Sequence, residues 1–290
     1  MSKRTVAKIV RGSHAIDGAG VHLTRVLGNQ TMYDFDPFLM LDGFDSTNPA
    51  EYMRGFPFHP HRGIETVTYL VSGSMEHQDS MGNKGVIGDG DCQWMTAGSG
   101  IIHQEMPMES ERMLGAQLWV NLPHKDKMAP PAYGDLRAED IPAVVGDGVV
   151  ARVLSGHYGE TKGYFTPKYV DVTYIDFELA PDKVFTFEGT PNDRTLFIYL
   201  LDGKIAVNEG LDDFESKGAA ILFKATTSAA TDRDEVTFKA GPDGARFILL
   251  SGRPLREPIA WGGPIVMNTR EELMEAFDEL DHNTFIKHAR

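Results

Sequence analysis

The sequence predicts an all-β protein built from two small β-barrels or sandwiches side by side, followed by a short C-terminal helix. Three observations lead to this fold class. Short apolar segments rich in β-branched and aromatic residues recur along the 290 residues, separated by glycine-rich turns. Two sequence patterns occur once in each half of the chain. The length and the 41% hydrophobic content are sufficient for two domains of ordinary size.

The individual elements follow from local patterns. The most regular strand segments are residues 66–71, 114–120, 169–177, 196–201, 219–223 and 247–250. A helix is expected near the C-terminus, where Thr269 can cap the first turn and Glu272 can complete a capping box. Leu273, Phe277 and Leu280 would then form an apolar stripe along one helix face.

The repeated patterns indicate a duplicated domain. TYLVSGSM (residues 68–75) and IYLLDGKI (198–205) share a tyrosine, a leucine and a turn glycine at an offset of 130 residues. GAQLWVNL (115–122) and GARFILLS (244–251) recur at an offset of 129 residues. Because the two offsets nearly agree, we expect two similar β domains rather than one large one.

The domain boundary is placed by composition. Residues 131–148 are rich in proline, glycine and acidic residues, with one short helical pattern at residues 136–140, which is typical of a linker. We therefore expect an N-terminal domain over residues 1–130 and a C-terminal domain over residues 149–290.

Charge and cysteine content narrow the functional classes. The 42 acidic and 28 basic residues give a net charge of −14, which disfavours direct binding to nucleic acid. The single cysteine, Cys92, excludes an intrachain disulfide and is expected to be a small buried hydrophobe. No targeting signal or membrane-length apolar run is visible. The expected location is the cytoplasm, or also the nucleus if the source is a eukaryote.

Two short motifs indicate a metal site. His59 and His61 are two residues apart, so on an extended backbone both imidazoles project to one side. His103 and Glu105 have the same spacing, and three imidazoles with one carboxylate suit a divalent first-row metal. Glu65 shares the parity of His59 and His61, although the glycine at position 63 would break the strand register, so spacing leaves Glu65 and Glu105 as alternatives.

Comparison of the two halves of the chain helps to decide whether these histidines bind a metal. An isolated His-x-His pair is more often incidental than ligating. The 130-residue offset places Gly189 and Pro191 where the first half has His59 and His61, and residues 158–281 contain no histidine. We therefore expect one metal ion in the N-terminal domain and none in the C-terminal domain.

At these residues the sequence resembles the pirins, members of the cupin superfamily. The resemblance lies in HPHRGIETVTYLVSGSMEHQDSMGNKG, GDCQWMTAGSGIIHQEMP, LWVNLP and, near the C-terminus, SGRPLREPIAWGGPIVMNTREE. It implies a bicupin whose N-terminal barrel holds a metal, usually iron(II), through three histidines and a glutamate. Matched position by position, these are His59, His61, His103 and Glu105, which favours Glu105 over Glu65. Gly98 replaces a proline common in other cupins, a departure that pirins share.

The resemblance also implies a function. Pirins are similar to quercetinases, which open the flavonol ring with O2 and release CO, and Glu105 would then be catalytic as the acceptor of the flavonol 3-hydroxyl proton. The alternative is an iron-dependent regulatory protein with a protein partner, either a transcriptional coregulator or a regulator of a metabolic enzyme. The fold does not separate these functions.

For other residues near the motifs, both a functional and a purely structural role are considered. Glu65 would hold an imidazole N–H or pair with an arginine. Arg62 would steer an anionic substrate or be an exposed residue without a function. His77 is expected at the surface or in packing. The large side chains that would either wall a pocket or fill the core are Trp94, Met95 and Trp119.

Overall fold

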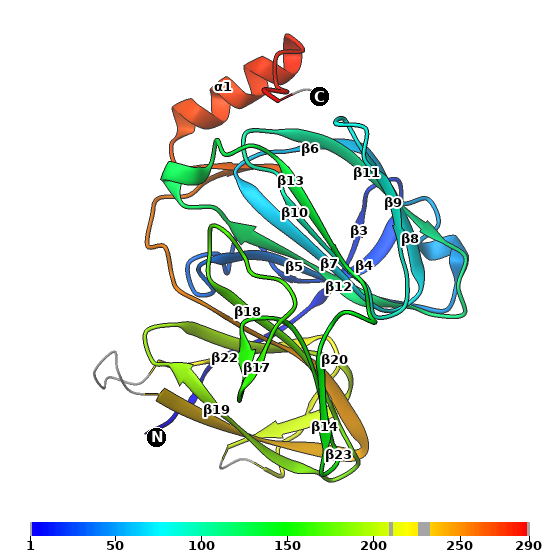
Figure 1. Cartoon of the computed structure of the whole chain (residues 1–290), viewed down its shortest axis with the longest axis vertical. Helices are drawn as coiled ribbons and strands as arrows, with labels where there is room; N and C mark the ends of the chain where they lie inside the picture. The colour runs from blue at the N-terminus through cyan, green and yellow to red at the C-terminus, as the bar shows by residue number, and fades with distance from the viewer. Residues whose placement is uncertain (1, 209–210, 226–232, 289–290) are drawn as a thin grey trace. The chain divides into compact units, whose positions relative to one another are not determined.

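The computed structural model describes residues 2–208, 211–225 and 233–288 (Figure 1). These residues are mostly β-strands, and they divide into two compact units. The first barrel consists of His14–Ala138 and Leu255–Arg290, and the second barrel of Met1–Ser13 and Glu139–Pro254. The predicted all-β class with a short C-terminal helix is confirmed, and each unit is assembled from two separate stretches of the chain.

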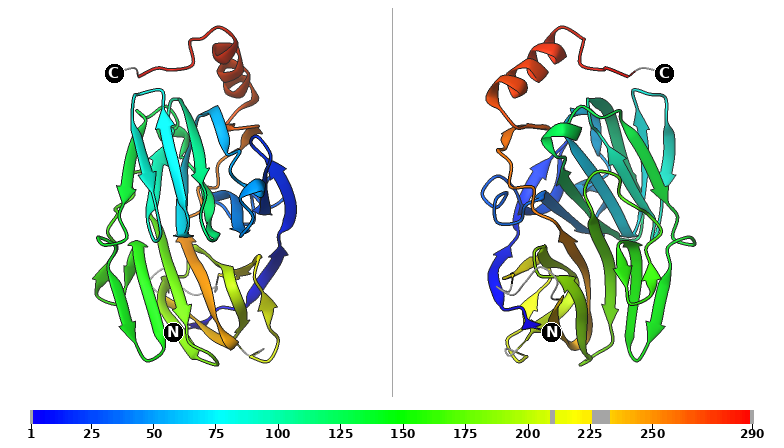
Figure 2. Two further views of the ribbon diagram at one scale, coloured as in Figure 1. Left: turned by 90° about the vertical axis from the view of Figure 1, so that its right-hand side faces the viewer. Right: turned by 60° about the vertical axis from the view of Figure 1, so that its left-hand side comes forward.

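The first barrel contains two sheets, described here from the residues given above (Figure 2). The larger has the order β13-β10-β7-β12-β5-β4-β3 and the smaller the order β6-β11-β8-β9. The strands of the larger sheet are β3 (Ser13–Asp17), β4 (Val21–Leu27), β5 (Phe38–Ser46), β7 (Ile64–Ser72), β10 (Cys92–Thr96), β12 (Met113–Asn121) and β13 (Ala132–Leu136). Those of the smaller are β6 (Phe56–His61), β8 (Ser74–Asp79), β9 (Lys84–Ile87) and β11 (Ile101–Met108).

The core of the first barrel lies between these sheets. Leu70 and Met113 from the larger sheet pack in one cluster with Met75 and Ile87 from the smaller. Along β11 buried positions alternate with half-buried ones, as expected of a strand with one face toward a core. This alternation turns every second side chain of β11 into the barrel interior, where the predicted metal ligands are found.

Residues beyond 254 return to the first barrel. They form β24 (Ala260–Gly262), β25 (Ile265–Met267) and the helix α1 (Arg270–Asp281). The predicted capping box is confirmed, because the Thr269 side chain accepts from the Glu272 amide and Glu272 accepts from the Thr269 amide. The apolar stripe of α1 packs against Ile265 and Met267. Two 3-10 turns, Pro49–Glu51 and His124–Asp126, complete this unit.

A buried lysine ties this returning segment to the strands. Lys127 Nζ donates to the carbonyl oxygen of Gly63 at 2.9 Å, to Asn121 Oδ1 at 2.7 Å and to the carbonyl oxygen of Val266 at 2.9 Å. Lys127 is 1% exposed. One ammonium group thus joins the β6–β7 turn, the end of β12 and β25.

The second barrel is one strongly coiled sheet of order β14-β15-β18-β23-β20-β22-β2 within the described residues, with β1, β19 and β21 paired beside this path. Its core is rich in phenylalanine, including Phe177, Phe187, Phe238 and Phe247. The strands are β1 (Ser2–Lys3), β2 (Val6–Arg11), β14 (Ala143–Gly146), β15 (Val149–Ser155), β18 (Val172–Leu179), β19 (Val184–Pro191), β20 (Thr195–Val207), β21 (Glu215–Ser216), β22 (Ala219–Phe223) and β23 (Arg233–Gly252). A separate hairpin pairs β16 (His157–Tyr158) with β17 (Thr161–Lys162).

The sequence repeats form corresponding strand pairs. In the first barrel the repeated segments lie in β7 and β12, which pair antiparallel with Tyr69 opposite Ala116. In the second barrel they lie in β20 and β23, which also pair antiparallel with Tyr199 opposite Ile248. The duplication expected from the offsets therefore repeats a pair of neighbouring strands.

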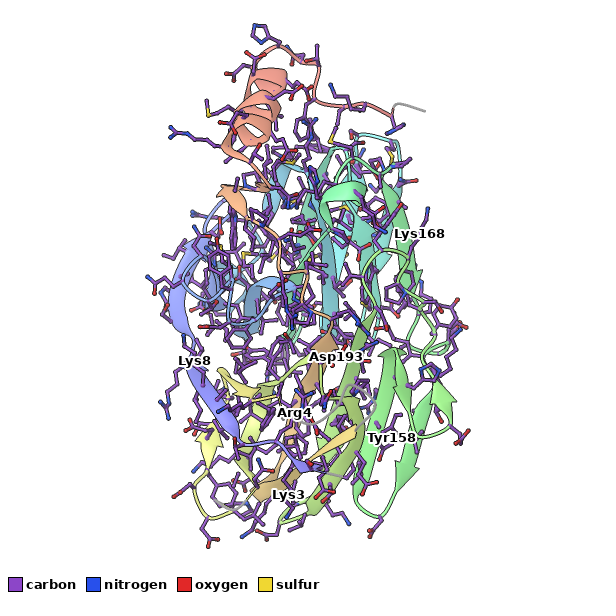
Figure 3. The ribbon with its side chains drawn as sticks, turned by 90° about the vertical axis from the view of Figure 1, so that its left-hand side faces the viewer. Lys3, Arg4, Lys8, Tyr158, Lys168 and Asp193 are labelled. Atoms are coloured by element: carbon purple, nitrogen blue, oxygen red, sulfur yellow. The ribbon has the colours of Figure 1, made fainter. Side chains whose placement is uncertain are left out.

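The chain passes from the first unit to the second between Ala138 and Glu139, inside the expected linker, but the expected limits of the domains differ from the structure. Within residues 131–148, β13 pairs with β10 of the first barrel and β14 pairs with β15 of the second, while residues 138–140 form a turn and no helix. Residues before position 14 belong to the second barrel. Buried Arg4, which is labelled in Figure 3, donates to Asp234 and to the carbonyl oxygens of Pro191 and Arg194. The expected limits therefore assign two terminal segments to the wrong unit: residues 1–13 belong to the second barrel, and residues 255–290 belong to the first.

Candidate metal centre

Three histidines meet in the interior of the first barrel. Strands β6 and β11 pair antiparallel with His59 opposite His103, so the two motifs face each other. The ring centroids of His59 and His103 are 4.4 Å apart, and those of His61 and His103 are 5.1 Å apart. One nitrogen of each of the three rings lies within 4.8 Å of the others. The structure thus brings together the three imidazoles that spacing predicted.

Backbone carbonyls fix the orientation of two of these rings. His59 Nδ1 lies 2.9 Å from the carbonyl oxygen of Pro57, and His61 Nδ1 lies 3.1 Å from that of Pro264. A carbonyl only accepts, so each Nδ1 carries the hydrogen and each Nε2 presents its lone pair. The two Nε2 atoms converge to 3.0 Å. Such outer hydrogen bonds are typical of metal-ligating histidines.

His103 completes this set of lone pairs. It is fully buried, and neither ring nitrogen has a hydrogen-bond partner among the described residues. Burial and the neighbouring imidazoles lower the pKa of His103 and of His61 well below the ordinary value, so both rings are neutral at pH 7. Neutral, unprotonated imidazole nitrogens are the form that binds a metal, so these residues fit a divalent cation.

Glu105 lies beside the three histidines. Its Oε2 is 4.0 Å from His103 Nε2, and the carboxylate is 2% exposed. Gln117 Nε2 donates to both carboxylate oxygens at 2.9 and 2.8 Å, and Thr68 Oγ1 donates at 3.0 Å. The register of β11 against β6 shifts between His103 and Glu105. The carboxylate is therefore fixed next to the cluster by residues of β7 and β12.

A cavity of about 450 Å³ opens onto this cluster. Its lining includes His59, His61, Gln117, Trp119 and Trp261, whereas His103 and Glu105 are not part of it. The Trp119 ring meets the His61 ring edge-on at 5.0 Å and the Trp261 ring at 5.8 Å. The volume and the aromatic walls suit a flat aromatic molecule.

Glu65 does not take either role expected for it. Its carboxylate accepts from Trp94 Nε1 at 3.1 Å and from Thr96 Oγ1 at 2.7 Å, rather than from an imidazole or an arginine. Gly63 has a φ of +78°, and a Cβ there would lie 1.9 Å from the Val266 carbonyl oxygen, so β6 ends before β7 begins. This break separates Glu65 from the histidine pair, as the sequence suggested.

Arg62 is neither exposed nor directed at a substrate. Its guanidinium donates to the carbonyl oxygens of Ser99 and Phe285 and to Glu279 Oε2 at 2.7 Å, and it lies 4.2 Å above the Phe285 ring. The side chain is 2% exposed. Arg62 therefore anchors the segment that carries α1, because a buried guanidinium needs this full set of acceptors.

The remaining predicted residues divide between core and cavity. Trp94 and Met95 are buried in the core and do not line the cavity, whereas Trp119 does. Cys92 is fully buried, as expected, and burial raises its thiol pKa well above the ordinary value. His77 is 4% exposed and stacks on Tyr133, so it is a packing residue and not a surface one.

Several residues of the site were not identified from the sequence. Gln117 is a polar side chain between apolar residues of β12, and this was the available signal for it, whereas Thr68 lies in a strand with several other polar residues. Trp261 and the Pro264 carbonyl come from a segment about 200 residues away from His61 along the chain. No local pattern connects such distant segments, so only the folded structure brings them to the cavity.

Comparisons with known proteins identify the family of the chain. The family model described as Pirin matches residues 20–120, and the Pirin C-terminal cupin domain matches residues 174–286. The chain is 44% identical to a pirin-like protein of Caulobacter vibrioides, over 98% of this chain and 100% of that one. It is 39% identical to pirin of Homo sapiens, over 95% and 91%. A quercetin 2,3-dioxygenase structure from Acinetobacter baumannii has a TM-score of 0.86 at 30% identity, over 98% and 99%.

No helix among the described residues has the length and apolar character needed to span a membrane.

Proposed function

The chain belongs to the pirin family, and on this premise we propose that it is a quercetinase-like dioxygenase that holds one iron(II) ion in its first barrel. The substrate class is a flavonol, whose central ring is opened by incorporation of both atoms of O2 with release of CO. The observation that carries the proposal is the convergence of three imidazoles, two of them buried and neutral, beside an aromatic cavity. Similarity to the Acinetobacter baumannii quercetin 2,3-dioxygenase supports the substrate class.

His59, His61, His103 and Glu105 would hold the ion. An iron(II) ion bound there would supply Lewis-acid and redox chemistry to a coordinated substrate oxygen and to O2. The protein contributes neutral histidine donors and one carboxylate, which keeps the net charge of the site low. The carbonyl groups of Pro57 and Pro264 keep two of the imidazoles in the required tautomer.

The cavity residues would bind and orient the flavonol. Trp119 and Trp261 offer aromatic faces to its fused rings, and Met40 and Phe56 extend the apolar lining. These walls exclude water from the reacting part of the substrate. The rings would lie with the 3-hydroxyl toward the histidine cluster, because His59 and His61 line the same cavity.

Glu105 is the proposed acceptor of the 3-hydroxyl proton, at Oε2. Gln117 stands on the cavity wall and donates to both oxygens of this carboxylate. A substrate hydroxyl that displaces Gln117 Nε2 from Oε2 would occupy the vacated acceptor position and pass its proton to the carboxylate. Gln117 therefore holds the Glu105 carboxyl group in place before the substrate arrives.

The test is oxygen uptake by the purified full chain loaded separately with iron(II), manganese, nickel, copper or zinc. With quercetin, the iron(II) form is expected to consume O2 and to release an equal amount of CO, with close to one ion per chain by elemental analysis. His103→Ala should lose both metal and activity, whereas His282→Ala, a change at an exposed histidine beyond α1, should lose neither.

Two outcomes would overturn the proposal. Two tightly bound ions per chain would contradict the single site. A fully metal-loaded chain that consumes no O2 with any flavonol would exclude the dioxygenase and favour the regulatory alternative, in which ferrous and ferric forms bind a protein partner differently.

A further inference from the structure

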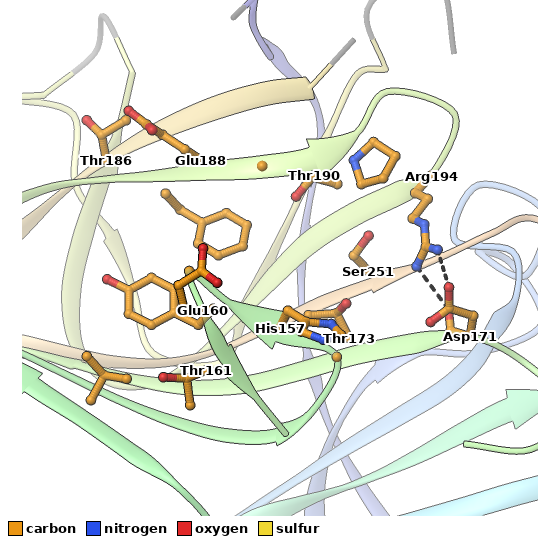
Figure 4. Close-up of a pocket in the computed structure, with 17 residues that line it drawn as sticks. His157, Glu160, Thr161, Asp171, Thr173, Thr186, Glu188, Thr190, Arg194 and Ser251 are labelled. Carbon is orange, nitrogen blue, oxygen red and sulfur yellow. Dashed lines mark hydrogen bonds and ion pairs between the residues drawn. The ribbon is translucent and has the colours of Figure 1, made fainter. Parts of the chain in front are cut away.

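The second barrel contains a cavity that the proposed reaction does not use. It has a volume of about 750 Å³, within the range of small-molecule sites of about 300–1,000 Å³. It is lined by the β16–β17 hairpin, the start of β18, most of β19 and Ser251 near the end of β23, and Figure 4 labels residues from each of these elements. All lining residues belong to the second barrel.

The cavity lies at the positions that correspond to the metal ligands of the first barrel. Gly189 and Pro191, which the 130-residue offset matches to His59 and His61, both line it. They are carried by β19, which pairs antiparallel with β23, just as β6 pairs with β11 in the first barrel. Where the first barrel has two imidazoles, the second has a glycine and a proline, which leave space but offer no metal donor.

Hydroxyl groups dominate the polar lining. One of them, Ser251 Oγ, has no hydrogen-bond partner among the described residues, and Ser251 is only 2% exposed, so water does not readily reach this hydroxyl either. An unsatisfied buried hydroxyl is uncommon in native proteins and calls for a missing partner. The hydroxyl-bearing residues of the lining are Tyr158, Thr161, Thr173, Thr186, Thr190 and Ser251.

The charges of the lining disfavour an anion. Glu160 and Glu188 contribute carboxylates, and Figure 4 shows both on the cavity. Arg194 is the one arginine or lysine of the lining, and its guanidinium is already paired with the Asp171 carboxylate. An incoming anion would meet carboxylates and an arginine already neutralised by its partner.

Aromatic rings supply an apolar face. Tyr158 from the hairpin and Phe187 from β19 are nearly parallel, with an interplanar angle of 11° and centroids 6.3 Å apart. Both line the cavity. A ligand that meets these rings and the hydroxyl groups together needs C–H faces and many hydroxyl donors and acceptors.

We propose that this cavity is a second binding site, independent of the metal, for a small neutral polyhydroxylated molecule of monosaccharide size. Its C–H face packs on Tyr158, and its hydroxyl groups bind Ser251, Thr190 and the carboxylates at the rim. The site lies in the second barrel, where the described residues form no cluster of metal ligands, so a ligand bound there would not alter the histidine set of the first barrel.

The experiment is calorimetry and saturation-transfer NMR on the full chain with D-glucose, D-galactose, D-mannose, L-arabinose and myo-inositol, with choline and inorganic phosphate as cationic and anionic comparators. At least one neutral probe is expected to bind saturably, and the two comparators are not. Tyr158→Ala should weaken binding roughly tenfold, through loss of the aromatic face. Ser251→Ala removes a hydroxyl that has no hydrogen-bond partner in the described part of the chain, so the fold should be retained, and binding should weaken about two- to tenfold.

The controls separate this site from other surfaces. Tyr164→Ala removes an exposed tyrosine of the same barrel outside the cavity and should leave binding unchanged. His59→Ala should also leave it unchanged, because the metal site is in the first barrel. The proposal is overturned if none of the neutral probes binds, if choline or phosphate binds in their place, if both cavity variants bind like the unaltered chain, or if His59→Ala abolishes binding.

Discussion

Replacing Lys127 by methionine is expected to destabilise the first barrel by an amount that grows with pH. Burial lowers the pKa of Lys127 to about 7, against about 10.4 for an unperturbed lysine. Between these values unfolding takes up a proton, so raising the pH opposes unfolding. The stability that the lysine provides relative to methionine is therefore smallest at or below pH 7 and increases toward pH 10.

The hydrogen bonds set the size of this effect. A neutral amine still donates two hydrogen bonds, enough for Asn121 Oδ1 and the Val266 carbonyl oxygen, while the Gly63 carbonyl oxygen keeps the Leu122 amide as a donor. Lys127→Met leaves two buried acceptors without these donors, at about 1–3 kcal/mol each. We expect Lys127→Met to lower the free energy of unfolding by about 3 kcal/mol at pH 9. At pH 7 this loss should be about 2 kcal/mol smaller, because the stability that the lysine provides changes by roughly 1.4 kcal/mol per pH unit.

Tryptophan fluorescence during urea unfolding measures this directly. The three tryptophans, Trp94, Trp119 and Trp261, all lie in the first barrel, so their signal reports on that unit. Lys125→Met, at an exposed lysine of the same 3-10 turn, is the matched control and should change stability by less than about 0.5 kcal/mol. Equal effects of the two variants, or a cost of Lys127→Met that falls as pH rises, would refute the reasoning.

Three further predictions concern the metal site and its support. His103→Ala should abolish metal binding and keep the circular dichroism spectrum, because the barrel has its own core; an unfolded variant would make the site structural. Glu105→Gln should lower metal content and flavonol-dependent O2 uptake, whereas Glu65→Gln, whose hydrogen-bond donors are core residues, should retain the metal; the reverse order would contradict the ligand set. Arg62→Met should reduce amide hydrogen-exchange protection of α1 by about 2 kcal/mol, because Glu279 loses a charged donor, and unchanged protection would count against that anchor.

Local patterns were sufficient for much of the fold and of the metal centre. The histidines were found because strand parity acts over two residues, and the pairing of His59 with His103 then needed only two antiparallel strands. The C-terminal helix was predictable because its capping box and apolar stripe are both local. Glu105 depended on the family resemblance, since spacing alone left Glu65 as an alternative.

The expected linker contains the boundary between the two units, but two parts of it form strands, and this has a physical reason. Strands β13 and β14 each stand at one end of the strand order of their sheet. Edge strands tolerate the prolines, glycines and charges that interior strands exclude, so their composition is that of a connection. The return of residues 255–288 to the first barrel could not be predicted for another reason. Arg62 and Lys127 bind backbone carbonyls of this segment, and the sequence does not indicate which distant carbonyls a buried arginine or lysine will bind.

The interleaving of the two barrels sets an order of events during synthesis. A ribosome makes His61 203 residues before it makes Pro264, whose carbonyl orients that ring. Until Pro264 emerges, the nascent first barrel lacks this hydrogen bond, the Trp261 cavity wall and the Val266 acceptor of Lys127. By then the segment that forms most of the second barrel has already been translated and can fold. Tight metal capture should therefore be a late event of biogenesis.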